Sequence, residues 1–282
     1  MEGKLASLRI ALWGASGRMG EAVLDCLGEQ SEMSLVAAVV SEGSTWRGRL
    51  LRERFPSAPA EQRFLCARDC PPCDLILDFS GAAGFAEALS TALRFGAALV
   101  SGSTGLSRQD EERLEQASAR IPVLWAANFS LGLIVLLALA EQAAAWLSDF
   151  DVELLDLHHR GKRDAPSGTA RALGEAVIRA KESQGCHARA VFQREGARGE
   201  GEVGMVSLRG GDAVGEHRLF LLGKGERLEL AHQVSDRRVF ARGALRAASC
   251  LAGRPPGRYR LESMLPSLVG PVELDRVGSR PV

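Results

Sequence analysis

The stretch LRIALWGASGRMG, residues 8–20, decides the fold of the first half of this chain. Its apolar run Leu8–Trp13 is typical of a buried strand, and the glycine-rich turn Gly14–Gly20 opens a helical pattern. Glycines at these positions allow a tight turn and let backbone N–H groups at the helix N-terminus approach a pyrophosphate. The order of strand, turn and helix favours a dinucleotide-binding loop over an ordinary βα turn.

Short apolar runs continue to alternate with helical patterns, which indicates βαβ units around a parallel sheet. The expected strands are Leu8–Trp13, Leu35–Val40, Leu75–Phe79, Ala97–Val100 and Val123–Trp125. The helices expected between them include Ala82–Phe95 and Arg108–Arg120. Residues 1–130 are therefore predicted to form a Rossmann-like α/β domain.

The pattern changes at Leu131–Leu147, an apolar stretch that we interpret as a buried helix because a bilayer span needs roughly 20 residues. A strand, Val152–His158, and a helix, Gly168–Ser183, follow. Three strand-like runs then come in succession, separated by glycine-rich turns: Val203–Leu208, Glu216–Leu222 and Arg227–Gln233. Residues 131–238 are predicted to form a smaller α+β domain with a mixed or antiparallel sheet.

The overall charge of the chain is balanced. Its 282 residues include 35 Lys plus Arg and 35 Asp plus Glu, so the chain has no field that would gather nucleic acid or an anionic membrane surface. The N-terminus does not have the pattern of a signal peptide, and we expect a cytoplasmic protein. The function is therefore expected to lie in a local site that binds a small molecule.

Three of the six cysteines, Cys66, Cys70 and Cys73, stand close together in CARDCPPC. We expect free thiols, as in a reducing compartment. A soft metal is one interpretation of this spacing, but three thiols do not complete a structural zinc site. We predict a surface loop before a strand, and no metal.

The end of the second expected strand reads Val39-Val40-Ser41-Glu42. NAD-preferring sites usually carry an acid at this tip to bind the ribose hydroxyls. Here the acid, Glu42, stands one or two residues beyond the tip of the strand. Ser41 and Arg47 can supply hydrogen-bond donors to a 2′-phosphate. The sequence therefore favours NADPH, with NADH as the alternative.

A polar segment follows the strand Val152–His158. Alternate side chains of a strand share a face, so Asp156 and His158 are expected to point together while His159 points away. A carboxylate beside an imidazole selects its tautomer and supports its protonated form, as a general acid requires. Lys162 adds a cation a few residues later.

A carboxylate clamp is predicted at the start of the next helix, where the N–H groups of Gly168 and Thr169 favour an anion. Arg237 or Arg238 is a candidate partner for a second substrate carboxylate, with a helix cap and exposed bases as the alternative. His217 and His232 are interpreted as structural residues. Taken singly, the paired histidines, the basic loop and the Pro-Ser-Gly helix start each have an ordinary structural explanation.

Five motifs resemble the 4-hydroxy-tetrahydrodipicolinate reductase family of bacterial lysine and diaminopimelate biosynthesis. They are GASGRMG at 14–20, SGSTG at 101–105, AANFSLG at 126–132, HHRGKRDAPSGTA at 158–170, and the closing pattern GEH at 215–217, His232 and SDRRVFARGAL at 235–245. They occur in the order typical of the family, and the segment at 158–170 is highly specific.

The resemblance implies a Rossmann-like cofactor domain made of residues 1–130 and 239–282, and a domain for substrate binding and homotetramer formation between them. It implies cofactor contacts from Gly14, Ala15, Ser16, Gly17, Arg18, Met19, Gly102, Ser103, Thr104, Ala126, Ala127, Asn128 and Phe129. It also implies that His158 donates or accepts a proton, that Lys162 donates one, and that His159, Gly168 and Thr169 bind a dicarboxylate substrate. The reaction would be hydride addition from NADPH or NADH to a conjugated cyclic imine, after loss of a hydroxyl as water.

Two other functions are compatible with a dinucleotide-binding domain. A semialdehyde or homoserine dehydrogenase is one, although the former needs a nucleophilic cysteine and none of the six stands in an active-site pattern. A regulator that senses NADPH without turnover is the other, but it would not need the polar segment His158–Thr169.

Overall fold

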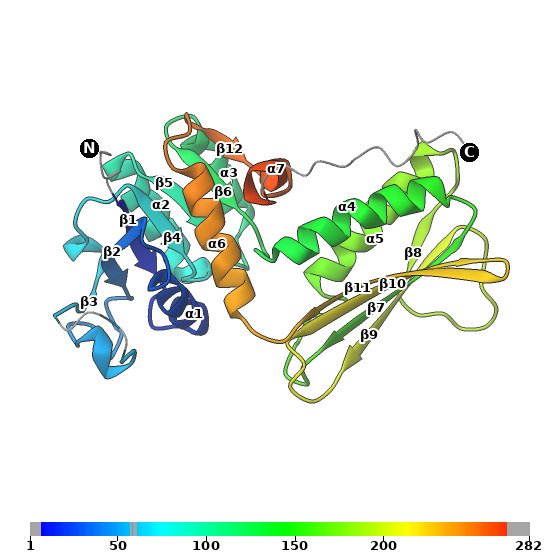
Figure 1. Cartoon of the computed structure of the whole chain (residues 1–282), viewed down its shortest axis with the longest axis horizontal. Coiled ribbons are helices and arrows are strands. Elements are labelled where there is room, and N and C mark those ends of the chain that lie inside the picture. The colour runs from blue at the N-terminus through cyan, green and yellow to red at the C-terminus, as the bar shows by residue number, and fades with distance from the viewer. Residues whose placement is uncertain (1–6, 57, 59–60, 270–282) are drawn as a thin grey trace, which may run out of the picture. The chain divides into compact units, whose positions relative to one another are not determined.

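The computed structural model of the chain describes residues 7–56, 58 and 61–269 (Figure 1). The chain divides into two compact units, of which unit 1 combines Met1–Phe129 with Phe240–Val282 and unit 2 is Ser130–Val239. Within the part of the chain that is described, no helix has the length and apolar character needed to cross a bilayer. Each unit is built around a sheet of its own.

A parallel sheet forms the centre of unit 1, which confirms the predicted Rossmann-like class. Among the described residues its strand order is β12-β6-β5-β4-β1-β2-β3, and neighbouring strands pair in parallel. The strands are β1 (Leu8–Trp13), β2 (Met33–Val39), β3 (Phe64–Leu65), β4 (Leu75–Asp78), β5 (Ala98–Ser101), β6 (Pro122–Trp125) and β12 (Gly257–Tyr259). The sequence pattern did not predict β3 and β12, which have only two and three residues.

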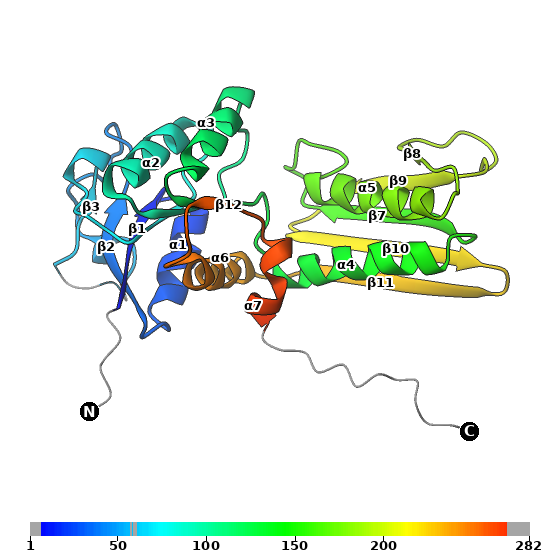
Figure 2. The ribbon, with the colours of Figure 1, turned by 90° about the horizontal axis from the view of Figure 1, so that it is seen from above.

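Helices cover both faces of this sheet, with α2 and α3 on one face and α1 and α6 on the other (Figure 2). The helices of unit 1 are α1 (Arg18–Leu27), α2 (Ala82–Phe95), α3 (Arg108–Ser118), α6 (Arg238–Leu251) and α7 (Leu265–Val269), with short 3₁₀ turns η1 (Leu51–Glu53), η2 (Ala67–Asp69) and η3 (Glu262–Met264). Successive β1 side chains alternate between the faces, and Ala11 and Trp13 pack under α2 and α3. Coverage on both faces explains why the strands read as continuous apolar runs.

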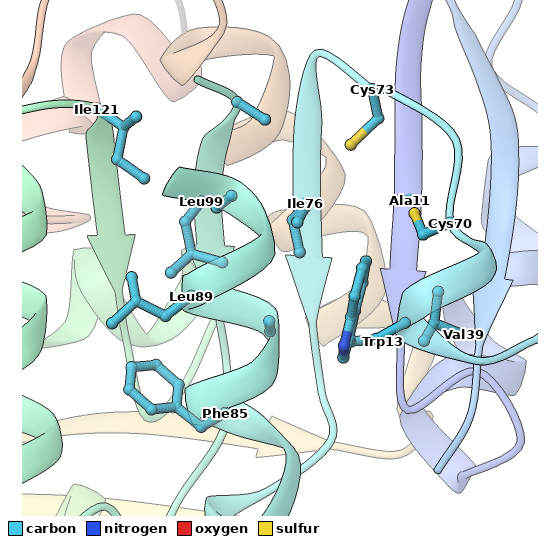
Figure 3. Close-up of a cluster of buried hydrophobic side chains, with 14 of the residues drawn as sticks. Ala11, Trp13, Val39, Cys70, Cys73, Ile76, Phe85, Leu89, Leu99 and Ile121 are labelled. Atoms are coloured by element: carbon cyan, nitrogen blue, oxygen red, sulfur yellow. The ribbon is translucent and has the colours of Figure 1, made fainter. Parts of the chain in front are cut away.

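The predicted surface loop at Cys66, Cys70 and Cys73 is wrong. These side chains are 0%, 6% and 4% exposed, and Cys70 and Cys73 belong to the same hydrophobic core as Trp13 and Ile76 (Figure 3). A hydrogen bond with Cys73 and burial raise the pKa of the Cys70 thiol, which keeps it protonated. Among the described residues, the three thiols do not converge as a set of metal ligands. Small apolar packing explains the pattern, because Cys behaves as a small hydrophobic residue.

Unit 2 is built on a mixed sheet of order β11-β10-β7-β9-β8, so of the two sheet types predicted the mixed one is confirmed. Its strands are β7 (Asp151–His158), β8 (Arg189–Val191), β9 (Glu202–Arg209), β10 (Gly215–Gly223) and β11 (Glu226–Val234). β7 pairs in parallel with β9 and antiparallel with β10. Strands β9 and β10 are consecutive in sequence but lie on opposite sides of β7. The last residues of β9 and the first residues of β10 therefore lie beside the carboxyl end of β7.

Two helices, α4 (Leu131–Trp146) and α5 (Gly168–Ser183), cover one face of this sheet (Figure 1). Their buried side chains form a core with Val152, Leu154 and Met205 from the sheet. The prediction of a buried α4 is right for one face only, because Leu139 and Trp146 are 51% and 77% exposed. The opposite face of the sheet carries no helix within the described part of unit 2 (Figure 1).

Candidate active site

The candidate cofactor residues of unit 1 gather at the carboxyl edge of its parallel sheet. β1 lies between β2 and β4, so the chain leaves β1 to one side for β2 and reaches β4 on the other side. Such a switch point is where open α/β sheets bind dinucleotides. The loop after β1 carries Gly14–Gly17, and Arg18 and Met19 open α1. The loops after β5 and β6 carry Gly102–Thr104 and Ala126–Phe129, and Ser41 follows β2.

The glycine loop has the shape and the donors that a pyrophosphate needs. Gly14 has φ of 74°, and a Cβ there would lie 2.5 Å from the Phe79 carbonyl oxygen. A Cβ on Gly20 would lie 2.5 Å from the Gly14 carbonyl oxygen. The N-cap of α1, Gly17, brings no side chain to the first helical N–H groups, so the positive end of this helix can receive an anion. The loop therefore fits the pyrophosphate of a dinucleotide.

The predicted cofactor residues differ in exposure. Ser16, Gly17, Arg18, Met19, Ser41, Thr104, Ala127 and Asn128 are partly or fully exposed. Ala15 and Phe129 are 0% and 1% exposed, and the Ala15 N–H donates to the Val39 carbonyl at 3.1 Å. Ala15 and Phe129 therefore hold the edge in place with their side chains rather than offer them to a ligand.

Sequence reasoning missed Asp78, the last residue of β4. This carboxylate is fully buried and accepts hydrogen bonds from the hydroxyls of Ser101 and Ser103, each at 2.7 Å. It also accepts the Ser80 N–H at 2.9 Å, and the Gly81 N–H donates to Ser103 Oγ at 2.8 Å. Asp78 thus ties the turn after β4 to the loop after β5. The backbone of Ser103 is engaged as well, because its N–H donates to Ser101 Oγ at 3.2 Å and its carbonyl accepts Trp125 Nε1 at 2.8 Å. Ser103 therefore positions the loop after β5.

The candidate catalytic group of unit 2 stands at the carboxyl end of β7. His158 Nδ1 lies 2.9 Å from Asp156 Oδ1, which confirms that the two side chains share a face. His159 is partly exposed. Because Nδ1 faces the carboxylate, Nε2 is the nitrogen of His158 that is left for a substrate.

Gly215 keeps that nitrogen accessible. This glycine begins β10, and a Cβ built on it would lie 3.0 Å from His158 Nε2. A side chain at position 215 would therefore crowd the nitrogen that faces away from Asp156. The motif GEH at 215–217 includes this glycine, but the sequence alone did not show its purpose.

Asp156 is held by groups from several elements. It is 0% exposed and accepts the Ser167 N–H at 2.8 Å and Arg209 Nη2 at 2.9 Å. Burial by itself raises the pKa of this carboxyl, but contacts with His158, His217, the Ser167 N–H and Arg209 outweigh burial and hold the pKa well below its usual range. Asp156 is therefore a permanent anion behind His158.

His217, which we interpret as a structural residue, also contacts this carboxylate. His217 Nε2 lies 3.4 Å from Asp156 Oδ1 and 3.2 Å from Ser167 Oγ. The imidazole rings of His217 and His158 are 5.3 Å apart, at 70°. The sequence signals were its place in the motif GEH and its alternation with Gly215, and they become useful once β10 is known to pair with β7.

Asp156, His158 and His217 also form the group of potential metal ligands within the described chain, with ligand atoms within 4.8 Å of one another. Arg209 already pairs with Asp156, so the positive charge that a metal would bring is supplied by a guanidinium. The donor set therefore suits proton transfer better than metal binding, and the absence of a metal stays a prediction.

Lys162 lies in the loop after β7. Its Nζ is 2.9 Å from Asp164 Oδ1, and its side chain is 22% exposed. Burial raises the pKa of Asp164, but the hydrogen bond from Lys162, a backbone hydrogen bond and the charges of Lys162 and Arg209 together outweigh burial and lower it. Arg209 Nη2 donates to the Asp164 carbonyl at 2.7 Å, so the loop that carries Lys162 is tied to the arginine that pairs with Asp156.

The start of α5 has the predicted form. Ser167 is the N-cap, and its Oγ accepts the Ala170 N–H at 3.1 Å. Gly168 and Thr169 are the first two helical residues, and both are at least partly exposed. Their N–H groups have no helical acceptor and favour an anion. Because the Ser167 N–H donates to Asp156, this anion site is anchored to the carboxylate behind His158.

Of the two arginines left as alternatives, Arg238 forms an ion pair with Asp236, with Nη2 2.5 Å from Oδ2. The Arg238 N–H also donates to Asp236 Oδ1 at 2.9 Å, as at a helix cap. Arg237 is partly exposed. Arg237 is therefore the better candidate for a carboxylate ligand.

Comparison with known proteins gives one consistent family. The family model described as dihydrodipicolinate reductase, N-terminus, matches residues 8–129, and the one described as dihydrodipicolinate reductase, C-terminus, matches residues 132–265. A 4-hydroxy-tetrahydrodipicolinate reductase from Stenotrophomonas maltophilia is 42% identical over 261 residues, covering 92% of this chain and 98% of its own. One from Pseudoalteromonas translucida is 40% identical over 262 residues, covering 91% and 97%.

Solved structures show the same fold. The dipicolinate-bound dihydrodipicolinate reductase from Paenisporosarcina sp. has a TM-score of 0.72 and 22% identity, and covers 92% of this chain and 99% of its own. An amine dehydrogenase from Mycobacterium smegmatis has a TM-score of 0.56 and 14% identity, and covers 91% and 96%. At these identities the structures establish the fold alone.

Proposed function

The chain belongs to the dihydrodipicolinate reductase family, and from this premise we infer how its residues carry out the family's reaction. Its activity is that of a 4-hydroxy-tetrahydrodipicolinate reductase, an oxidoreductase of lysine and diaminopimelate biosynthesis that uses NAD(P)H. The substrate and one proton take up a hydride and release water to give tetrahydrodipicolinate. The observation that carries our assignment of the catalytic residues is the Asp156–His158 contact beside Lys162 and the start of α5.

We propose that His158 and Lys162 handle the protons. The chemistry that a reduced nicotinamide supplies when bound is a hydride. Hydride addition leaves negative charge on the substrate's ring nitrogen, which a nearby cationic donor stabilises. Lys162 donates the proton there. His158 Nε2 donates or accepts a proton while Asp156 holds the other side of the ring.

The clamp for the substrate carboxylates is proposed to consist of His159, Gly168, Thr169 and Arg237. The N–H groups of Gly168 and Thr169 bind one carboxylate at the start of α5, where the helix dipole favours negative charge. Arg237 offers bidentate hydrogen bonds to the second carboxylate. When the substrate binds, Lys162 gives up its ion pair with Asp164 and contacts the substrate instead.

For the cofactor we propose contacts by Gly14–Met19, Ser41, Gly102–Thr104 and Ala126–Phe129, with a preference for NADPH over NADH. The preference rests on the end of β2, where Val40 and Ser41 replace the acid typical of NAD-preferring sites. We also place the enzyme in the cytoplasm, where its thiols stay reduced.

The test is an assay of NADPH and NADH oxidation with freshly generated product of the preceding synthase. We expect substrate-dependent oxidation of both cofactors, faster with NADPH, measured as loss of the absorbance of the reduced nicotinamide. Turnover with neither cofactor, alongside intact NADPH binding by calorimetry, would contradict the proposal and favour a cofactor-sensing regulator.

A homotetramer is proposed, with the helix-free face of the unit 2 sheet as an interface. Val206 and Leu208 point to that face, because their register partners on β7, Leu155 and Leu157, alternate with the buried Leu154. Val206 and Leu208 are 51% and 44% exposed, and exposed apolar patches mark interaction surfaces.

Val206→Asp combined with Leu208→Asp is expected to break this interface, because a second copy would have to bury two carboxylates. Light scattering after size-exclusion chromatography should show a smaller assembly than for the wild type. Leu139→Asp, at an equally exposed apolar residue on α4, is the control and should leave the mass unchanged. An unchanged mass for the double variant would refute the interface.

A further inference from the structure

The end of β2 carries an ion pair that the sequence did not predict. Arg68 Nη1 lies 3.3 Å from Glu42 Oε1, and the two side chains are 60% and 61% exposed. We propose that Arg68 leaves Glu42 to bind the 2′-phosphate of NADPH, and that Glu42 binds the ribose hydroxyls of NADH. The two side chains together then set the choice between NADPH and NADH. This proposal rests on the cofactor site of the proposed function and names its specificity-determining residue.

Backbone hydrogen bonds place this pair at the position for the adenosine ribose. The Ala15 N–H donates to the Val39 carbonyl at 3.1 Å, and the Val40 N–H donates to the Leu65 carbonyl at 2.9 Å. The end of β2 therefore lies between the glycine loop and the end of β3. In doubly wound folds a nearby acid binds the ribose hydroxyls and a nearby arginine accepts the 2′-phosphate. Both types of side chain are present here, and they contact each other.

Arg68 is presented by a firmly anchored turn. Its neighbours in the 3₁₀ turn η2 are buried, with Ala67 5% exposed and Cys66 0% exposed. Cys66 Sγ donates to Asp69 Oδ2 at 2.7 Å, and the Asp69 N–H donates to the Cys66 carbonyl at 3.0 Å. The buried cysteine thus holds the turn from which the exposed guanidinium extends, and replacing Arg68 should not disturb the fold.

The exposed pair can exchange partners. An ion pair exposed on both sides is weak, whereas a guanidinium and a phosphate form charge-assisted, bidentate hydrogen bonds. NADPH is therefore expected to draw Arg68 from Glu42. With NADH, Glu42 accepts the ribose hydroxyls. Arg47, the arginine suggested by the sequence, is exposed in the Ser41–Leu50 loop, and it is the competing candidate that the test separates from Arg68.

The test compares Arg68→Ala, Glu42→Gln and Arg47→Ala. For Arg68→Ala, the ratio of kcat/KM with NADPH to kcat/KM with NADH should fall roughly 10- to 100-fold, as expected for loss of hydrogen bonds to a charged group. Calorimetry on the free enzyme should show weaker binding of 2′,5′-ADP and unchanged binding of 5′-AMP. Glu42→Gln should shift the ratio toward NADPH. If Arg68 and not Arg47 binds the 2′-phosphate, Arg47→Ala should leave the ratio and the binding of 2′,5′-ADP unchanged.

An unchanged ratio and unchanged 2′,5′-ADP binding in Arg68→Ala would overturn the proposal, as would a shift that appears in Arg47→Ala instead. Failure of the proposed reductase function can be distinguished from failure of this proposal. If wild type turned over no substrate while Arg68→Ala still lost 2′,5′-ADP affinity, the role of Arg68 would stand and the proposed function would fall.

Discussion

Lys162→Ala should lower kcat by about 10²- to 10⁴-fold, the usual contribution of a positioned general acid, while the Kd for NADPH stays unchanged. In the proposed mechanism Lys162 supplies the proton and the positive charge at the substrate's ring nitrogen, and alanine offers neither. The candidate cofactor residues belong to unit 1, whereas Lys162 belongs to unit 2. Steady-state kinetics and calorimetric NADPH binding measure the two effects separately.

Arg163→Ala is the matched control for Lys162, since Arg163 is an exposed cation one residue away in the same loop. It should retain nearly full activity. An equal loss in both variants would mean that the loop needs positive charge in general, and an unchanged kcat for Lys162→Ala would refute the proton-donor role.

Asp156→Asn is expected to affect both activity and stability. The amide keeps the shape of the side chain but loses the negative charge that faces His158 Nδ1. With His158 as the proposed proton-transfer group, kcat should fall by about 10²- to 10⁴-fold. Arg209, with its side chain only 17% exposed, loses its ion-pair partner. Breaking a buried pair typically costs about 3–5 kcal/mol. Urea unfolding should therefore show a lower free energy of unfolding, by an amount in that range.

The pH dependence gives a further readout for this variant. The pKa of Asp156 is lowered in the folded protein, so its contribution to stability is fully present above the unfolded pKa of about 3.9 and is lost as pH falls through the folded pKa. The difference in unfolding free energy between wild type and Asp156→Asn should shrink in acid. Asp212→Asn, at an exposed carboxylate in the turn before β10, is the control. A constant difference from neutral to acidic pH would contradict the ionised role of Asp156.

Local sequence patterns were enough to predict the fold class of each domain. They also predicted the glycine loop and the contact between Asp156 and His158. The run Leu8–Gly20 predicted a strand, a turn and a helix because each depends on neighbours a few residues away. The alternation of Asp156 and His158 along one strand predicted their contact for the same reason. The strand β3 escaped prediction because its two residues carry no periodicity.

The remaining features depend on contacts between residues far apart in the chain. His217 meets Asp156 because β10 pairs with β7, and Asp78 meets Ser101 and Ser103 because β4 pairs with β5. Arg68 reaches Glu42 because β3 pairs with β2.

The sequence by itself thus determined the strand, turn and helix around Gly14–Gly20 and the shared face of Asp156 and His158, because strand, turn and cap chemistry is local. It also predicted the roles of these segments in dinucleotide binding and proton transfer. Only the tertiary structure decided which carboxylates are buried behind those segments, which histidine is the second partner of Asp156, and which arginine stands at the end of β2. Sheet pairing brings those groups together, and no spacing along the chain encodes it.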